Sequence, residues 1–182
     1  MSFFHECNMD LLSKIRTVAD FPKPGINFFD VTSILEDPEV FAYSVKRIEK
    51  IAVTYGIESI VAVDARGFIW AGAIADRLRC SLFLARKPGK LPGELVTKEY
   101  DTEYSTASLS MIKNHSIASP VLIVDDILAT GGTLKAIGQL LTENWNIAPE
   151  KQIHCVLLEL GFLSGRQVLQ DLGYCVESIS LA

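Results

Sequence analysis

The sequence lacks several features that would assign it to a large class of proteins. No apolar run approaches the roughly 18 residues that a membrane-spanning helix needs. The opening residues, MSFFHECNMD, have neither the basic start nor the long apolar stretch of a secretory signal. Asp and Glu outnumber Lys and Arg, and the net charge of −5 is unusual for a general nucleic-acid binder. We therefore expect a cytoplasmic protein that binds neither membranes nor nucleic acids.

Cysteine is scarce, and its spacing does not suggest metal or redox chemistry. The four cysteines are spread widely along the chain, at Cys7, Cys80, Cys155 and Cys175. No two of them form a C-x-x-C pair, so neither a zinc ribbon nor a thioredoxin-type site has support. A chain of 182 residues can bury a substantial core without disulfides. We expect reduced cysteines that are mostly buried as small apolar residues.

Short apolar runs alternate along the chain with stretches of helical periodicity. Runs without polar alternation are typical of strands that are buried on both faces of a parallel sheet. Strands are expected at 60–63, 81–84, 121–124, 153–158 and 174–179. Helical patterns cover residues 9–18, 38–55, 68–78, 134–141 and 162–172. This order predicts one α/β domain over residues 1–182, with a mostly parallel central sheet flanked by helices.

Two segments interrupt the alternation and are expected to be shaped loops. Residues 21–25 hold two prolines and a glycine, which together break the preceding helical pattern. Residues 87–115 begin with glycine and proline and continue as a polar stretch. The second segment is long enough to be a loop or hairpin that covers a binding site.

The strongest chemical signal is the sequence VLIVDDILATGGT at residues 121–133. A buried parallel strand delivers the chain to the carboxyl edge of a sheet, where ligands of α/β proteins bind. Asp125 and Asp126 at that edge can accept hydrogen bonds from sugar hydroxyls or hold a divalent cation, directly or through water. In the TGGT stretch at 130–133, the glycines allow backbone N–H groups to turn around an anion at a helix start. The combination predicts a ribose 5-phosphate site.

Two further segments place cations after predicted strands. Arg66 follows one strand in the sequence DARGF, and a guanidinium beside backbone amides suits an anionic pyrophosphate. Arg86, Lys87 and Lys90 bring three cations into five residues of an otherwise acidic chain. Neither P-loop nor G-x-G-x-x-G spacing occurs, so these rival phosphate motifs are excluded.

Residues 121–133 resemble the signature of the type I phosphoribosyltransferases, which bind 5-phosphoribosyl 1-pyrophosphate. The resemblance extends from about Ala19 to about Leu169. Within that family, the sequence resembles the adenine branch in particular. The segments that carry it are FPKPGI at 21–26, ARGF at 65–68, RKPGKLPG at 86–93, Glu103-Tyr104, and the Glu159-Leu160, Leu163 and Gly165-Arg166 positions.

This resemblance implies a fold with particular appendages and a particular reaction. A small hood over the base would come from residues 1–35, and residues 87–115 would be a flexible catalytic loop. The reaction would be a Mg²⁺-dependent transfer of ribose 5-phosphate to adenine, giving AMP and pyrophosphate in purine salvage. The family further implies a homodimer.

The resemblance also implies roles for individual residues. The catalytic residues would be Glu103, which relays a purine proton, Tyr104, which closes over the reacting centre, and Arg66 at the pyrophosphate. The base would contact Ile26, Phe29 and Leu160. Asp125 and Asp126 would hold the metal, through water. The donor would be bound by Asp125, Asp126, Ala129, Thr130, Gly131, Gly132, Thr133, Arg66, Arg86, Lys87 and Lys90.

Two departures from the family pattern keep alternatives open. Phe29 stands where relatives usually carry Arg, so another purine base (hypoxanthine, guanine or xanthine) could be the acceptor. A non-catalytic regulator that senses the donor is a further alternative.

Asp64-Ala65 replaces the residues that usually precede Arg66 in the family. Related enzymes carry a non-proline cis peptide at the matching bond, so the resemblance implies a cis peptide between Asp64 and Ala65.

Overall fold

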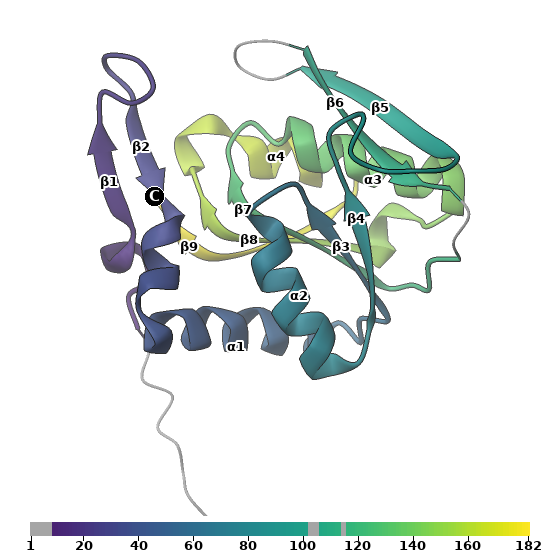
Figure 1. The fold of residues 1–182 in the computed structure, drawn as a ribbon, viewed down its shortest axis with the longest axis horizontal. Coiled ribbons are helices and arrows are strands. Elements are labelled where there is room, and N and C mark those ends of the chain that lie inside the picture. Colours follow the sequence, from purple (N-terminus) through teal and green to yellow (C-terminus); the bar gives the residue numbers. More distant parts are fainter. Residues whose placement is uncertain (1–8, 102–105, 114–115) are drawn as a thin grey trace, which may run out of the picture.

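The computed structural model describes residues 9–101, 106–113 and 116–182. Its centre is a five-stranded sheet in the order β4-β3-β7-β8-β9, with every neighbouring pair parallel (Figure 1). The strands are β3 (Ser59–Val63), β4 (Ser81–Ala85), β7 (Val121–Leu128), β8 (Gln152–Glu159) and β9 (Cys175–Leu181). The helices are α1 (Pro38–Thr54), α2 (Gly67–Leu78), α3 (Gly132–Trp145) and α4 (Gly165–Gln170). The predicted α/β class with a mostly parallel sheet is confirmed.

Local sequence explains where these elements start and why the inner strands lie deep in the molecule. Every residue of β3 and of β8 is buried, as their apolar runs predict, and in β8 the burial extends to Gln152, His154 and Glu159. The carboxylate of Asp37 accepts the backbone N–H groups of Glu39 and Val40 at 2.9 and 3.3 Å, and Pro38 occupies the first turn of α1. Both features are typical of a helix start, so α1 begins where the sequence predicts.

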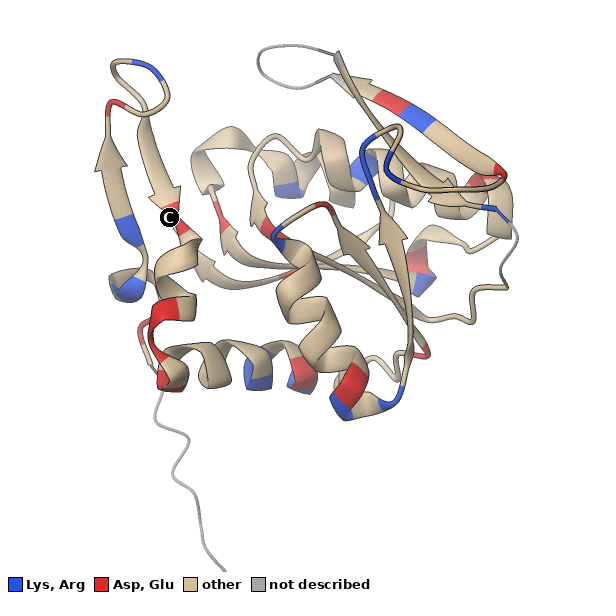
Figure 2. Ribbon diagram, viewed as in Figure 1, with Lys and Arg blue, Asp and Glu red and all other residues tan. Residues whose placement is uncertain are grey.

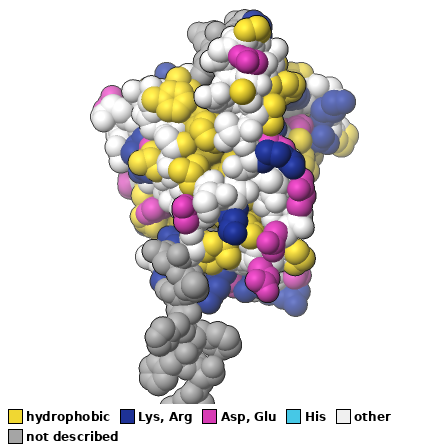
Figure 3. Space-filling view, turned by 90° about the vertical axis from the view of Figure 1, so that its left-hand side faces the viewer, with side chains coloured by type: hydrophobic (Ala, Val, Ile, Leu, Met, Phe, Trp, Pro, Cys, Tyr) yellow, Lys and Arg dark blue, Asp and Glu magenta, His cyan; other side chains and the backbone are white. Residues whose placement is uncertain are grey.

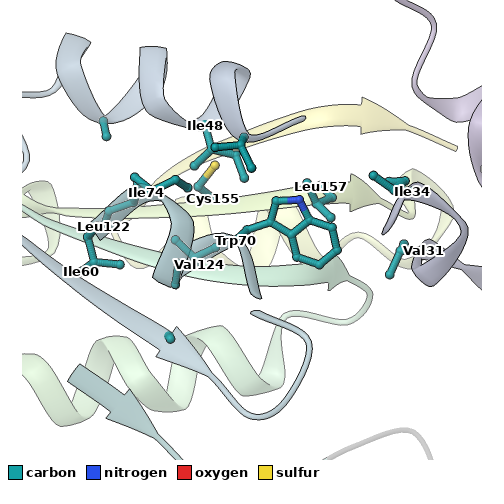
Figure 4. Packing of buried hydrophobic residues seen from close by; sticks show 14 of the residues in the cluster. Val31, Ile34, Ile48, Ile60, Trp70, Ile74, Leu122, Val124, Cys155 and Leu157 are labelled. Carbon is teal, nitrogen blue, oxygen red and sulfur yellow. The ribbon is translucent and has the colours of Figure 1, made fainter. Parts of the chain in front are cut away.

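The sheet separates two hydrophobic clusters, one on each face. One cluster lies under α1 and α2 and is centred on Trp70, whose indole N–H donates to Ser44 Oγ at 2.8 Å (Figure 4). The other lies under α3 and α4 and includes Ile137 and Leu169, both fully buried. Since both faces are covered, the site chemistry is confined to the edges and loops.

The helix predicted over residues 9–18 is wrong. A 3-10 helix at Leu12–Lys14 is followed by strand β1 (Arg16–Ala19), which pairs antiparallel with β2 (Asn27–Asp30). Leu11 and Ile15 are buried as expected, but all four residues of β1 are exposed. The structure of this segment is therefore determined by its pairing with β2 and not by an amphipathic helical pattern. We call β1, β2 and the loop between them the N-terminal ribbon.

Residues 87–115 contain a hairpin, one of the two alternatives expected for them. Strands β5 (Leu95–Asp101) and β6 (Thr106–Ile112) pair antiparallel, and Lys98 Nζ contacts Glu143 Oε1 of α3 at 2.5 Å. The proposed division of the single domain into a hood and a flexible loop stays a prediction.

Three smaller expectations need correction or comment. The helix expected over 162–172 is split into a 3-10 turn at Gly161–Leu163 and the short α4, because Ser164 between them adopts a left-handed backbone with φ of 56°. Of the described cysteines, Cys155 is buried while Cys80 and Cys175 are half-buried, and all three are free thiols; Cys7 lies outside the described residues. Within the described ranges, no helix has the length and apolarity to cross a membrane.

His154 generates a prediction about the pH dependence of stability. Its ring is fully buried in β8, 4.7 Å from the Tyr174 ring, and neither of its nitrogens has a partner among the described residues. Burial lowers the pKa of His154 to about 3. A histidine in the unfolded chain titrates near about 6.5, so the unfolded state binds an extra proton between these values. The free energy of unfolding should therefore be fully present above about pH 6.5 and fall below it.

The measurement is urea unfolding of the wild type and of His154→Phe at about pH 7 and about pH 5. Between these pH values, His154 should lower the free energy of unfolding of the wild type by roughly 2 kcal/mol, and this loss should be absent from His154→Phe. His5 and His115 are present in both proteins, so their contribution cancels. Equal losses in the two proteins would contradict a buried neutral His154.

Candidate active site

The carboxyl ends of β3, β4 and β7 converge, and charged residues gather where they meet (Figure 2). The turn after β3 carries Asp64 and Arg66, and the backbone N–H of Asp64 donates to Ala85 O at the end of β4, at 3.0 Å. Asp125 and Asp126 lie in the last half of β7, which continues to Leu128 and thus beyond the four residues predicted for this strand. The peptide bond between Asp64 and Ala65 is cis, as predicted.

Two ion pairs hold the arginines of this edge. Arg66 Nε pairs with the carboxylate of Asp126, which is 8% exposed, whereas the Arg66 side chain is 43% exposed. Arg86 Nε pairs with Asp64 Oδ2 at 3.1 Å, and its guanidinium lies 5.5 Å from the centre of the Phe68 ring. Each guanidinium therefore has one charged partner inside the protein and further donors that can face a ligand.

Asp125 is a buried carboxylate that lies directly beside a second carboxylate, Asp126. Its carboxylate is buried and accepts the backbone N–H of Asp126 at 2.9 Å. Burial raises the pKa of Asp125 well above its usual range, and the neighbouring charge of Asp126 adds to this effect. A buried carboxyl group with a strongly raised pKa at such a sheet edge is a candidate for contact with a ligand.

The segment Ala129–Thr133, which we call the Gly loop, leads from β7 into α3. Gly131 has a φ of +84°, a left-handed conformation that glycine adopts without a steric penalty. No side chain from the described part of the chain caps the start of α3. The first N–H groups of a helix have no partner inside the helix, so this loop can bind an anion such as a phosphate.

A cavity of about 600 Å³ adjoins the Gly loop through Ala129. Its walls come from the N-terminal ribbon, the end of β7 and the segment after β8, and Figure 3 shows apolar side chains gathered on the face that carries the ribbon. The lining residues are Pro22, Gly25, Ile26, Asn27, Phe28, Phe29, Ile127, Ala129, Leu160, Phe162 and Leu163. A flat apolar ligand that carries a few polar edge atoms fits such a wall.

The structure brings many of the predicted site residues together. Ile26 and Phe29 line one cavity with Leu160, which lies more than a hundred residues later in the sequence. Arg66 contacts Asp126, and Ala129 joins the cavity to the Gly loop.

The predicted lysines of the site lie on the surface. Lys87 and Lys90 are exposed in the loop after β4, and the backbone carbonyl of Lys90 accepts a hydrogen bond from Arg86 Nη1 at 3.5 Å. Glu103 and Tyr104 lie outside the described residues.

The sequence alone does not reveal part of the cavity wall or the ion pairing at the sheet edge. Ile127 and Phe162 line the cavity, yet nothing in their local pattern distinguishes them from ordinary core residues. Asp64 is the ion-pair partner of Arg86, and this role depends on the pairing of β3 with β4, which the local sequence does not indicate. Within the described ranges, no three His, Cys, Asp or Glu side chains converge as a metal cluster.

Comparison with known proteins decides the family. Residues 30–161 match the model of the phosphoribosyl transferase domain. The adenine phosphoribosyltransferase of Alkaliphilus metalliredigens is 41% identical over 175 residues, which cover 94% of this chain and 98% of the relative. The chain belongs to the adenine phosphoribosyltransferase family.

Solved structures of adenine phosphoribosyltransferases agree in fold over nearly the whole chain. The enzyme from Giardia lamblia, in complex with 9-deazaadenine, superposes with a TM-score of 0.87 at 32% identity and covers 95% of this chain and 96% of its own. The enzyme from Saccharomyces cerevisiae, whose complex contains adenine, has a TM-score of 0.82 at 29% identity and covers 94% and 97%.

The buried carboxylate of Asp125 leads to a prediction about stability. Because its pKa is raised on folding, the ionised group destabilises the fold at neutral pH, and this penalty disappears as pH falls toward the carboxyl's ordinary range. Asp125→Asn keeps an acceptor for the Asp126 N–H and removes the charge, so it should raise the free energy of unfolding by about 0.5–2 kcal/mol at neutral pH.

Asp126→Asn is the matched control, because it removes the partner of Arg66 and should not stabilise the protein. Thermal unfolding of both variants, near neutral pH and near about pH 4, provides the measurement. The gain of Asp125→Asn should shrink at the lower pH; a loss of stability at neutral pH would contradict the assigned direction.

Proposed function

We propose that the protein transfers ribose 5-phosphate from 5-phosphoribosyl 1-pyrophosphate to adenine, and forms AMP and pyrophosphate. In this reaction the bond from C1 of the ribose to the pyrophosphate oxygen breaks, and a bond from C1 to N9 of the base forms. The observation that carries the proposal is the adjacency of an apolar cavity, an anion-binding Gly loop and two carboxylates at one sheet edge. These three elements correspond to base, phosphate and ribose.

The donor side follows from the charges of the site. We assign the 5-phosphate to the Gly loop and the ribose hydroxyls to Asp125 and Asp126, which can accept hydrogen bonds. The pyrophosphate is assigned to Arg66 and Arg86, because each guanidinium has donors left after pairing with one carboxylate. Lys87 and Lys90 stand exposed in the loop after Arg86 and add positive charge to the same leaving group.

Mg²⁺ is the proposed cofactor, and the residues present fit it. This cation is usually held by one or two carboxylates together with substrate phosphates, not by a cage of protein ligands. Asp125 and Asp126 supply such a minimal donor set, through water or directly. When bound, the metal would neutralise the charge that develops on the departing pyrophosphate.

The acceptor side follows from the cavity wall. Ile26, Phe29 and Leu160 pack on the faces of the base, and the backbone of β2 offers N–H and C=O groups to its edge. No Lys or Arg occurs among the described residues that line the cavity, so we assign the edge of the base to backbone groups and to Asn27. The choice of adenine over the alternative purines rests on the similarity to adenine phosphoribosyltransferases, with Phe29 in place of the usual Arg.

The remaining assignments rest on family membership. Glu103 relays the proton of the purine imidazole, and Tyr104 closes over the reacting centre. The presence of these two residues favours an enzyme over a regulator that senses the donor. A cytoplasmic homodimer is proposed on the same ground.

Base selectivity is the first test of this function. With Mg²⁺ and the donor present, kcat/KM for adenine should exceed that for hypoxanthine, guanine and xanthine by at least about a hundredfold, because a site that matches polar edges rejects mismatched ones strongly. Phe29→Leu should raise the KM for adenine roughly tenfold through lost packing, and leave the KM for the donor unchanged. Faster turnover of an oxopurine would overturn the choice of base and implicate Phe29.

Glu103 provides the test of catalysis. Glu103→Gln should lower kcat by about 10²–10⁴-fold, the usual value of a positioned proton-transfer group, while the KM for the donor stays within about threefold. Glu94→Gln is the control in the same segment, because Glu94 forms a surface pair with Lys113 at 2.9 Å. If both variants keep wild-type kcat, Glu103 has no part in proton transfer.

A further inference from the structure

The start of α4 lies directly against the Gly loop, with no side chain between the two backbones. A Cβ atom placed on Gly165 would lie 2.1 Å from Ala129 O and 3.0 Å from Gly131 N. A Cβ atom on Gly131 would in turn meet Gly165 O at 2.9 Å. The Cβ would also meet Leu128 Cδ1 at 2.9 Å, but the closest contact is with a backbone atom that cannot rotate away, so any side chain at Gly165 would displace the loop.

Arg166, the next residue, fixes the start of α4 to the sheet. Its Nε lies 2.9 and 3.0 Å from the two carboxylate oxygens of Glu159, and its Nη2 lies 2.5 Å from Glu159 Oε2. The same guanidinium donates to Val176 O at 2.7 Å and to Ser178 Oγ at 3.0 Å in β9. One planar group thus joins α4 to the end of β8 and to the first half of β9 with fixed geometry.

Glu159 is well suited to anchor this arrangement. It is the last residue of β8, and its side chain is only 7% exposed. The hydrogen bonds from Arg166 lower the pKa of Glu159, so the pair is ionised at neutral pH. The adjacent Leu160 donates its N–H to Leu128 O at 2.9 Å, immediately before the Gly loop. The loop is therefore supported from Leu160 on one side and from Gly165 on the other.

We infer that Gly165 and Arg166 are positioning residues for donor binding. The Glu159–Arg166 pair holds the start of α4, and Gly165 in turn sets the place of the Gly loop. Backbone donors bind an anion well only when they are held within about 0.5 Å of the productive geometry. A misplacement of about 1 Å can cost about a hundredfold in rate. The inference rests on the proposed function of the Gly loop as the phosphate site.

A purely structural role for these residues predicts different kinetics. General destabilisation lowers the fraction of folded enzyme and hence the apparent kcat, but it does not change the KM of the molecules that remain folded. A displaced Gly loop raises the KM for the donor and the Kd of ribose 5-phosphate, whether or not the melting temperature falls. The two roles are separated by comparing these constants.

The principal experiment compares Gly165→Ala with Gly138→Ala. A Cβ on Gly138 in α3 would lie 2.6 Å from the Tyr174 ring, so this control crowds the same face of the sheet without contacting the Gly loop. Gly165→Ala should raise the KM for the donor, and the Kd of ribose 5-phosphate by calorimetry, at least about tenfold. Gly138→Ala should leave both within about twofold of wild type.

A milder pair of variants covers the case in which crowding prevents folding. Arg166→Lys keeps the positive charge but cannot form the fork with Glu159, Val176 and Ser178. Arg77→Lys makes the same exchange in the surface pair of Arg77 with Glu49, at 2.6 Å. Only Arg166→Lys should raise the KM for the donor, by about fivefold or more, since its loop support is loosened.

The outcomes distinguish this inference from the function on which it rests. If Gly165→Ala or Arg166→Lys lowers only the melting temperature, and the KM and Kd match those of the controls, the positioning role is refuted while the proposed function stands. If the wild-type protein itself neither binds ribose 5-phosphate nor consumes the donor, the proposed function fails, and the inference fails with it.

Discussion

Strand β7 is hydrogen-bonded to β3 on one side and to β8 on the other, and the arrangement of the functional segments follows from that central position. Residues of parallel neighbours stand level with one another, as Ala62 does with Val124 and Leu128 with Glu159. The strand ends therefore arrive at one edge. Arg66 can reach Asp126 from the end of β3, and Leu160 can reach Leu128 from the end of β8.

The same edge concentrates buried charge in a part of the molecule that water reaches poorly. Asp125 and Asp126 are adjacent carboxylates with little exposure, and Asp126 forms the ion pair with Arg66. Such an arrangement is costly for folding, because desolvation and like-charge repulsion act together. The apolar clusters on both faces of the sheet supply the stability that tolerates it. The proposed contacts with ribose hydroxyls and Mg²⁺ would account for the presence of these carboxylates.

Sequence patterns were sufficient for the elements that bury uniform apolar surfaces. The inner strands β3, β7 and β8 each contain a run of at least four apolar residues, and such runs have few structural alternatives in an α/β chain. The helix prediction for residues 9–18 was wrong because their structure depends on a partner strand. All four residues of β1 are exposed, and the strand is defined by its pairing with β2. The pairing of Arg86 with Asp64 and the contact of Gly165 with the Gly loop likewise join segments whose approach only the tertiary fold determines.

The N-terminal ribbon and the central sheet are separate hydrogen-bonded units within the described residues. The ribbon supplies Ile26, Phe28 and Phe29 to the wall of the cavity, whereas the charged groups at the strand ends belong to the sheet and its loops. Under the proposed function, the ribbon contributes to recognition of the base together with Leu160, whereas the sugar and its phosphates are held by the sheet and its loops alone. Substitutions in the ribbon would then alter which base is accepted without moving the groups that hold the donor, so acceptor choice is free to diverge in evolution while the donor chemistry stays constant.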